Sequence, residues 1–289
     1  MRFGAKVENF GSEVTMERVL ERGRIAEEAG FDSVWLSDHI AMPLTSDSRY
    51  PYANDGKISW QLDEPWLDPV TLLSALAAVT TRLRLGVAVM LVNLREPINL
   101  AKQLACVEQL APGRLTLGVG DGWLKEELAL FQVSFSDRRV RTDEHLRLME
   151  EVWSGSISTT GAHSTSSTSY SVKPVPGQPI DVFIGGQSPA VFARIAKSGY
   201  GWLPLPGADH TLDVVRRGVE TIEQMKRATL ATSTPEKVRV IVNAGSIESI
   251  AHILPELEAL GVEEVLVEAS FDEFDGPEKV LAIARTALA

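Results

Sequence analysis

Residues 29–38, AGFDSVWLSD, and residues 260–269, LGVEEVLVEA, share one pattern, in which a glycine ends a helix-forming stretch and an apolar strand follows at once. Gly30 and Gly261 suit the left-handed turn that closes an α-helix. The strands that follow are nearly continuous in apolar residues, whereas a strand with one face in water alternates apolar and polar side chains. The pattern is therefore typical of parallel strands that are covered by helices.

The same strand-then-helix unit recurs outward from these two segments along the chain. We expect strands at Arg2–Glu8, Ser33–His39, Arg82–Met90, Leu115–Gly120, Asp181–Gly186, Tyr200–Leu205, Val238–Ala244 and Glu264–Phe271. We expect helices at Thr15–Ala29, Pro69–Thr80, Pro97–Leu110, Thr142–Trp153, Pro189–Ser198, Leu212–Leu230, Ile247–Leu260 and Pro277–Leu288. Eight such units predict a single α/β domain over residues 1–289, folded as a (β/α)8 TIM barrel. An open doubly wound sheet is the alternative.

Three long insertions interrupt this rhythm, at Ile40–Leu67, Asp121–Arg141 and Ser154–Ile180. The first two directly follow the second and fourth strands, so we place them at the C-terminal face of the barrel, where barrel enzymes build their sites. The first is rich in aromatic residues and is interpreted as a pocket wall or lid, or else as a structural flap without substrate contact; its aromatic residues are Tyr50, Tyr52, Trp60 and Trp66. In the third, Ser164–Ser171 is rich in Ser and Thr and is expected to be a mobile loop.

Composition narrows the classes of function. The chain has 289 residues, a net charge of −11 and a single cysteine, Cys106, so no disulfide forms within it. No apolar run reaches the roughly 18 residues that cross a bilayer, and the first residues lack the apolar core of a signal peptide. We therefore expect a cytoplasmic protein. The acidic balance argues against nonspecific binding to nucleic acid or to an anionic membrane, since both need clustered Lys and Arg.

Two strand ends carry groups suited to chemistry. Asp38 and His39 end the second strand, and an imidazole beside a carboxylate acts as acid or base near neutral pH; a hydrogen-bonded structural pair is the alternative. Residues 117–123, LGVGDGW, contain three alternating glycines. Such a segment lets a ligand approach the backbone closely, at Gly120 for example, although a flexible turn explains it too.

A third strand end, residues 184–189 with the sequence IGGQSP, suits an anion. A strand ends there in two glycines and a helix opens at the Ser188 cap, so exposed amides and the positive end of the helix point at one place. We favour a phosphate site over a plain tight turn. No set of His, Asp, Glu or Cys has the spacing of a metal site, and no metal is expected.

Taken together, several segments resemble the luciferase-like monooxygenase superfamily, and most closely its branch that uses the deazaflavin coenzyme F420. The segments are GFDSVWLSDH (30–39), WLDPVTLLSALAAVTTRLRLG (66–86), LAKQLACVEQLAPGRLTLGVGDGW (100–123), KPVPGQPIDVFIGG (173–186) and IGGQSPAVFARIAKSGYGWLP (184–204). The likeness covers roughly residues 1–205, and the last third matches mainly in its strand–helix pattern.

The resemblance implies roles for particular residues. His39 would be the active-site acid or base, and Asp38 would contact the cofactor. A non-proline cis peptide between Ala88 and Val89 would form a bulge behind the cofactor ring. Gly120 would face the cofactor, Trp66 and Trp123 would line the substrate pocket, and the phosphate would be held by Gly185, Gly186, Gln187 and Ser188.

Three functions follow as expectations. The first is hydride transfer between F420 and a small organic substrate, with His39 handling the proton. The second is a two-component monooxygenase that uses reduced FMN and oxygen, and the third is a barrel that only binds a cofactor or a partner. The expected partners are a small-molecule substrate and a flavin or F420 reductase. The sugar-phosphate dehydrogenases of this branch carry a glutamate where this chain has Trp123, which argues against their substrate.

The helix at Pro69–Thr80 predicts a homodimer. Its apolar residues surround the axis, whereas a barrel helix needs only one apolar face. An apolar outer face would leave a large exposed patch on a monomer, and pairing across a two-fold axis would cover it. Relatives in the superfamily are often dimers. The alternative is that the Ile40–Leu67 insertion folds over this helix within one chain.

Overall fold

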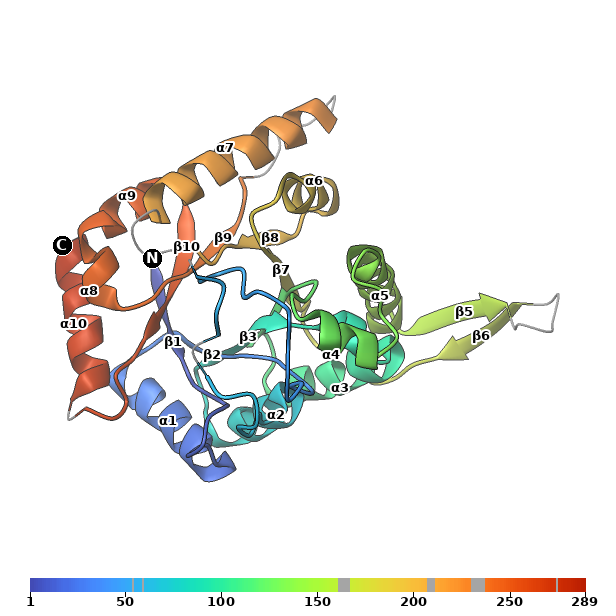
Figure 1. Cartoon of the computed structure of the whole chain (residues 1–289), viewed down its shortest axis with the longest axis horizontal. Helices are drawn as coiled ribbons and strands as arrows, with labels where there is room; N and C mark the ends of the chain where they lie inside the picture. Colours follow the sequence, from blue (N-terminus) through green and yellow to red (C-terminus); the bar gives the residue numbers. More distant parts are fainter. Residues whose placement is uncertain (54, 59, 161–166, 207–210, 230–236, 274) are drawn as a thin grey trace.

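The computed structural model describes residues 1–53, 55–58, 60–160, 167–206, 211–229, 237–273 and 275–289. Eight parallel strands close into a barrel in the order β1-β10-β9-β8-β7-β4-β3-β2 (Figure 1). These strands are β1 (Arg2–Lys6), β2 (Ser33–Leu36), β3 (Arg84–Met90), β4 (Leu115–Val119), β7 (Asp181–Gly185), β8 (Gly201–Leu203), β9 (Val240–Asn243) and β10 (Val262–Glu268). The predicted (β/α)8 barrel is confirmed, and the open sheet is wrong.

Helices surround the barrel (Figure 1). They are α1 (Met16–Ala29), α2 (Pro69–Val79), α3 (Pro97–Leu110), α4 (Lys125–Leu130), α5 (Arg138–Trp153), α6 (Pro189–Ser198), α7 (Thr211–Thr229), α8 (Ile247–Ile250), α9 (Leu254–Ala259) and α10 (Gly276–Leu288). The helix predicted at Ile247–Leu260 is divided into α8, a short 3₁₀ turn and α9, because Pro255 cannot donate the hydrogen bond of a continuous helix. The predicted end of α7 at Leu230 lies outside the described residues.

The barrel interior is packed with side chains. Five buried residues of the strands form one apolar cluster, and the half-buried Ala88 and Val89 pack against it; the five are Trp35, Phe183, Leu203, Ile241 and Leu266. A larger apolar cluster fills the space between the strands and the helices. Because the interior is solid, a ligand site has to be built above it, at the C-terminal ends of the strands.

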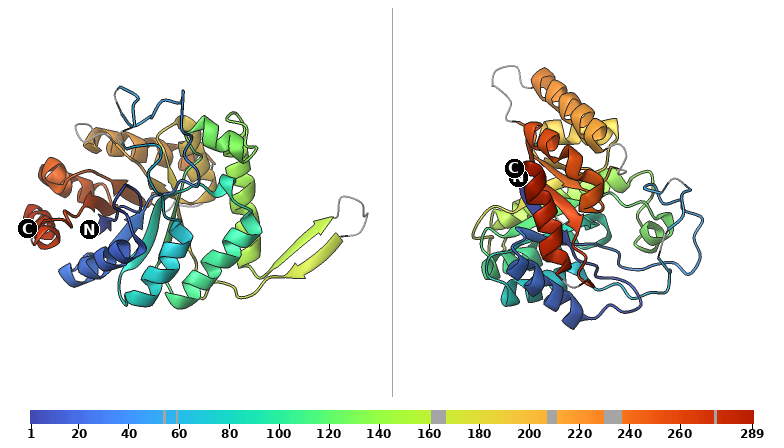
Figure 2. Two further views of the ribbon diagram at one scale, coloured as in Figure 1. Left: turned by 60° about the horizontal axis from the view of Figure 1, so that its bottom comes forward. Right: turned by 90° about the vertical axis from the view of Figure 1, so that its left-hand side faces the viewer.

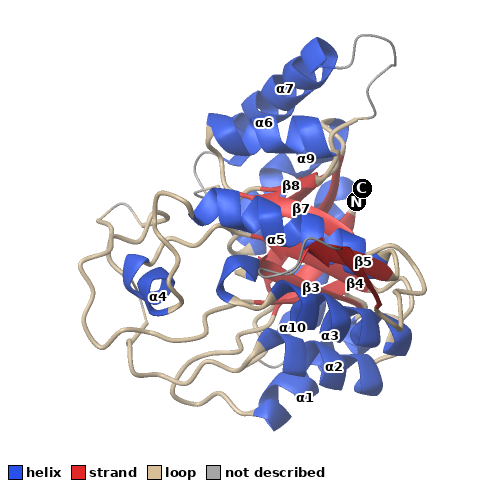
Figure 3. Cartoon of the chain, turned by 90° about the vertical axis from the view of Figure 1, so that its right-hand side faces the viewer, coloured by secondary structure: helices blue, strands red, loops and turns tan. Residues whose placement is uncertain are grey.

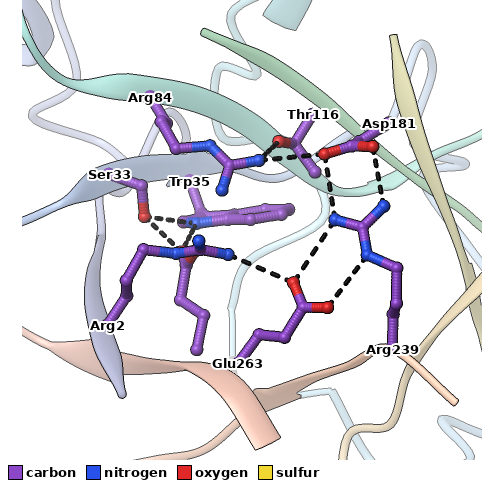
Figure 4. Close-up of polar contacts among 9 residues, drawn as sticks. Arg2, Ser33, Trp35, Arg84, Thr116, Asp181, Arg239 and Glu263 are labelled. Carbon is purple, nitrogen blue, oxygen red and sulfur yellow. Dashed lines mark hydrogen bonds and ion pairs between the residues drawn. The ribbon is translucent and has the colours of Figure 1, made fainter. Parts of the chain in front are cut away.

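An ion-pair network closes the opposite end of the barrel (Figure 4). Nη1 and Nη2 of Arg239 lie 2.7 and 3.0 Å from the two carboxylate oxygens of Asp181, and its Nε lies 2.9 Å from Glu263. The fully buried Glu264 accepts from Trp35 Nε1 at 2.9 Å and from Arg2 Nε at 3.1 Å. All of these groups except Trp35 lie at the N-terminal ends of the strands. The network therefore joins β1, β7, β9 and β10 at the end of the barrel opposite the candidate site.

The third insertion contains structure that the sequence did not predict. Strands β5 (Ser156–Thr160) and β6 (Ser167–Ser171) pair as an antiparallel hairpin, which projects away from the barrel (Figure 2). The expectation of a mobile loop at Ser164–Ser171 is therefore wrong for 167–171, and residues 164–166 lie outside the described residues. The two strands are stabilised by pairing with each other, which their polar composition does not indicate.

Helix α2 is covered within the chain. Leu72, Leu73 and Leu76 are fully buried, and α1 and α3 flank the helix on both sides. Only Thr71 and Ala78 of α2 are exposed. The large apolar patch that motivated the homodimer is not found on α2, because a barrel helix packs against its neighbouring helices as well as against the strands. The homodimer itself stays a prediction.

Candidate active site

The C-terminal rim of the barrel brings His39 and Glu127 together. His39 follows β2, and its Nδ1 atom lies 2.7 Å from Oε2 of Glu127 on α4. Oε1 of the same carboxylate accepts from the backbone N–H groups of Ile40 and Ala41, at 2.7 and 3.1 Å. The Glu127 side chain is 1% exposed and that of His39 is 9% exposed. The carboxylate thus fixes the orientation of the imidazole and the start of the loop that follows it. Figure 3 shows α4 among the long loops on one side of the barrel.

Asp38 faces a different partner. Its two carboxylate oxygens lie 2.6 and 2.7 Å from the guanidinium of Arg95, and the backbone N–H of Leu91 donates to it at 2.8 Å. Burial raises the pKa of the Asp38 carboxyl, and Arg95 opposes that rise. Through these bonds Asp38 ties the end of β2 to the segment after β3. Its contact with a cofactor stays a prediction.

The peptide bond between Ala88 and Val89 is cis, as the resemblance implied. The register between β3 and β4 shifts just there, between Val87 and Met90. Gly120 and Gly185 lie against the displaced Val89: a Cβ atom on Gly120 would overlap the Val89 side chain, and one on Gly185 would come within 3.0 Å of it. These two glycines are therefore needed for packing around Val89, a reason that the sequence did not reveal.

The start of α6 forms a cradle of polar groups. Gly186 has φ +101°, a conformation that favours glycine. Ser188 caps α6 and accepts from the backbone N–H of Val191 at 3.4 Å. Gln187 and Ser188 are exposed, and Trp202 fixes the turn by donating from Nε1 to the Gly186 carbonyl at 2.8 Å. This cradle fits the phosphate of a nucleotide-like cofactor, because a glycine turn and a helix N-terminus aim N–H groups at one anion.

Five rings form a closed circuit, which we call the aromatic collar. Its members are His39, Trp66, Trp60, Tyr50 and Trp123. Successive ring centroids are 4.8 Å apart from His39 to Trp66, 5.9 Å from Trp66 to Trp60, 5.2 Å from Trp60 to Tyr50, 5.2 Å from Tyr50 to Trp123 and 6.0 Å from Trp123 back to His39. Three members come from the first insertion and one follows β4. The first insertion thus brings aromatic side chains beside Trp123 and His39, and its role as a pocket wall or lid stays a prediction.

Asn9 holds the collar in place. It is fully buried, and its Nδ2 donates to the carbonyls of Ser37 and Leu67 at 2.9 and 2.8 Å, while its Oδ1 accepts from the N–H of Ser37 at 2.8 Å. The ring of the adjacent Phe10 stacks on Trp66 at 4.2 Å. Asn9 thereby joins the segment after β1, the end of β2 and the last turn of the first insertion.

Glu127, Asn9 and Arg95 were not singled out from the sequence. For Glu127 a signal did exist, since a carboxylate follows four residues after Trp123, on the insertion already assigned to the site. In the described part of the chain, no group of three or more His, Cys, Asp or Glu could hold a metal ion. No described helix is both long enough and apolar enough to cross a membrane.

Comparison with known proteins agrees with this architecture. The family described as luciferase-like monooxygenase matches residues 1–269. An uncharacterised protein of Mycobacterium tuberculosis is 31% identical over 256 residues, which are 88% of this chain and 86% of the relative. An F420-dependent glucose-6-phosphate dehydrogenase of Kineococcus radiotolerans is 31% identical over 205 residues, which are 68% of this chain and 56% of that enzyme.

Among solved structures, an F420-dependent secondary alcohol dehydrogenase in complex with an F420–acetone adduct has a TM-score of 0.72. The likeness spans 100% of this chain and 99% of that one at 15% identity, so it supports the fold alone. The family match, by contrast, covers nearly the whole sequence. The chain belongs to the luciferase-like monooxygenase family and is an oxidoreductase of that family.

Proposed function

We propose that the protein is a deazaflavin-dependent oxidoreductase that moves a hydride between coenzyme F420 and a small organic substrate. The observation that carries the proposal is the His39–Glu127 pair, which lies at the same rim of the barrel as the cradle at the start of α6. The named F420-dependent relative supports the choice of cofactor. The deazaflavin, when bound, supplies the hydride acceptor or donor that the amino-acid side chains lack.

His39 handles the proton in this proposal. A carboxylate only accepts hydrogen bonds, so Glu127 favours a proton on Nδ1 and leaves Nε2 to exchange protons with a substrate. Hydride removal from an alcohol carbon makes its hydroxyl acidic, and His39 takes that proton. In the reverse direction His39 returns it to the carbonyl oxygen.

The cofactor's phosphate is assigned to Gly185, Gly186, Gln187 and Ser188, and its ring to the face formed by Ala88, Val89 and Gly120. Two observations support the fit. Ala88 and Val89 are half-buried on top of the packed interior, and a side chain at Gly186 would have to adopt φ +101°. Trp66 and Trp123 line the substrate side in this assignment.

A two-component FMN monooxygenase is the second candidate. It has to shield a reactive oxygen adduct from water, and the aromatic collar beside the 9% exposed His39 favours such shielding. A non-catalytic binding subunit would not need the buried carboxylate behind His39. A flavin or F420 reductase, a small-molecule substrate and a second copy of the chain complete the set of partners that we expect.

The deciding experiment titrates the purified protein with F420 and, separately, with FMN, and follows binding by the absorbance of each cofactor. Turnover is then measured with and without oxygen. The proposal expects F420 to bind and turnover to persist without oxygen. Selective FMN binding with oxygen-dependent turnover would establish the monooxygenase. Binding of neither cofactor would favour a non-catalytic subunit that binds only a partner.

A further inference from the structure

Two indole groups of the aromatic collar lack hydrogen-bond acceptors. The Nε1 atoms of Trp60 and Trp66 are both buried, and neither has a partner in the described part of the chain. Three other indoles do have acceptors: Trp35 donates to Glu264 at 2.9 Å, Trp153 to the Ala101 carbonyl at 2.9 Å and Trp202 to the Gly186 carbonyl at 2.8 Å. A buried N–H without an acceptor is unfavourable, and native proteins pair the great majority of such groups. The two rings are neighbours, with centroids 5.9 Å apart, so two donors of one small region await an acceptor that the described part of the chain does not supply.

The collar is also apolar and uncharged apart from His39. Burial raises the pKa of the Tyr50 phenol to about 12, so Tyr50 is neutral at physiological pH. The carboxylate of Glu127 lies directly behind His39, and Asp121 is close enough to raise the pKa of the nearby Tyr52, whose pKa is raised first by burial. Asp121 is itself paired with Arg194 at 3.0 Å, so a phosphorylated substrate would meet the negative charge of Glu127 and aromatic faces. A flat, neutral molecule would gain stacking on the rings.

We propose that the aromatic collar binds a flat, uncharged ketone or the matching alcohol, and that Trp60 and Trp66 determine this specificity by donating from Nε1 to its oxygen. This inference deepens the proposed function and rests on it for the reaction. In that reaction the alcohol carbon loses a hydride to oxidised F420, the hydroxyl proton passes to His39, and the product is the ketone. The reverse reaction consumes reduced F420 and one proton.

Calorimetric titration of the wild-type protein tests the binding step without turnover. The probes are 1-indanone, a flat aromatic ketone; indane, which has the same rings without the oxygen; and glucose 6-phosphate. The variants Trp60→Phe and Trp66→Phe keep an aromatic ring and remove only the N–H donor. Trp153→Phe is the matched control, because its indole already has an acceptor on α3. Thermal melts of each variant establish that it is folded.

The expected result is that 1-indanone binds more tightly than indane and that glucose 6-phosphate does not bind. Each collar variant should weaken 1-indanone by about three- to tenfold, the range for one lost hydrogen bond, and should leave indane unchanged, as should the control for both ligands. The proposal is overturned if the wild-type protein fails to bind 1-indanone. It is also overturned if the folded Trp60→Phe and Trp66→Phe variants both bind 1-indanone as the wild type does, which would mean that buried water satisfies the two indoles. Because these measurements need no cofactor, they stand apart from the F420 titration, which alone decides the proposed function.

Discussion

The Nδ1 atom of His39 lies 2.7 Å from Oε2 of Glu127, a residue 88 positions further along the chain. One short helix, α4, thus supplies the group that orients the imidazole at the end of β2. The second oxygen of that carboxylate binds the backbone of Ile40 and Ala41, so the ring and the loop after it are fixed by a single side chain. Such an arrangement is what a proton-transferring histidine needs, since its tautomer is set by the partner of its other nitrogen.

Glu127→Gln should lower turnover strongly while leaving the fold intact. The glutamine carbonyl can keep accepting from Ile40, but its NH₂ group then faces Nδ1 and favours the tautomer with the proton on Nε2. We expect a loss of about 10²–10⁴-fold in kcat, the usual contribution of a general acid or base. The pH profile of kcat and the ¹⁵N NMR signals of His39 would report the changed tautomer.

Glu126→Gln is the matched control for this change. Glu126 is the preceding residue of α4 and binds Ser48 and the backbone of Asp47, away from the imidazole. His39→Ala should lose as much turnover as Glu127→Gln and keep cofactor affinity, and the double variant should be little worse because the two residues act as a unit. A loss below tenfold in either single variant would assign the pair a structural role only.

Gly186→Ala should weaken cofactor binding. A side chain at φ +101° strains the turn before α6 and displaces the N–H groups assigned to the phosphate. We expect affinity to fall by about tenfold, equivalent to about 1.4 kcal/mol. Gly199→Ala provides the comparison, because Gly199 ends the same helix at φ +78° with no heavy atom within 4 Å of a Cβ placed there. Equal affinities of the two variants would place the phosphate elsewhere.

The fold could be predicted because its signals are local. Each barrel strand is a short apolar run, and Gly30 and Gly261 do mark helix ends, with φ of +95° and +84°. The hairpin β5–β6 was missed because its strands are polar and depend on pairing with each other. The predicted Ile247–Leu260 helix is divided because of Pro255. The prediction missed this break because it rested on the spacing of apolar residues, which takes no account of proline.

The site could be predicted only in part, for a related reason. His39 and Gly186 follow strands directly, and strand ends in a barrel meet at one rim. Glu127 and Asn9 are ordinary polar residues in sequence, and only the path of the insertions brings them to His39 and Trp66. The pairing of Asp38 with Arg95 could not be predicted either, because Arg95 lies beyond the next strand and only the fold brings its guanidinium to the Asp38 carboxylate.

Asn9→Ala should destabilise the fold. The change leaves the carbonyls of Ser37 and Leu67 and the N–H of Ser37 without their partner in a buried site. At about 1 kcal/mol for each hydrogen bond, the free energy of unfolding should fall by about 3 kcal/mol. Urea denaturation measures it, with the exposed Asn99→Ala on α3 as the control. If the Asn9 variant loses no more stability than the control, water replaces the side chain at little cost.

A homodimer remains our expectation, now based on the resemblance rather than on α2. The remaining exposed apolar side chains include Leu110 on α3, which is 56% exposed, so this side of the barrel still offers a surface for pairing. Light scattering at micromolar concentration should give twice the chain mass of 31.5 kDa. A mass near 31.5 kDa would refute the dimer.

Asp181→Asn should change the stability of the barrel in a pH-dependent way. Hydrogen bonds from Arg239 lower the pKa of the Asp181 carboxyl below its ordinary value of 3.8, although burial opposes them, and Arg84 adds to the effect. A carboxyl whose pKa is lower in the folded state stabilises that state fully above the unfolded pKa and loses this contribution as the pH falls through the folded pKa. Asp181 therefore stabilises the protein at pH 7 and ceases to do so well below pH 4.

Because the Asp181 side chain is 34% exposed, solvent screening limits the loss of stability at pH 7 to about 1–2 kcal/mol. Urea unfolding of wild type and variant at pH 7, 5 and 3 should show the difference narrowing at the lowest pH, while the exposed Asp63→Asn stays within about 0.5 kcal/mol of wild type at pH 7. A difference that is the same at all three pH values would mean that the shape of the side chain, and not its charge, holds Arg239 at the base of the barrel.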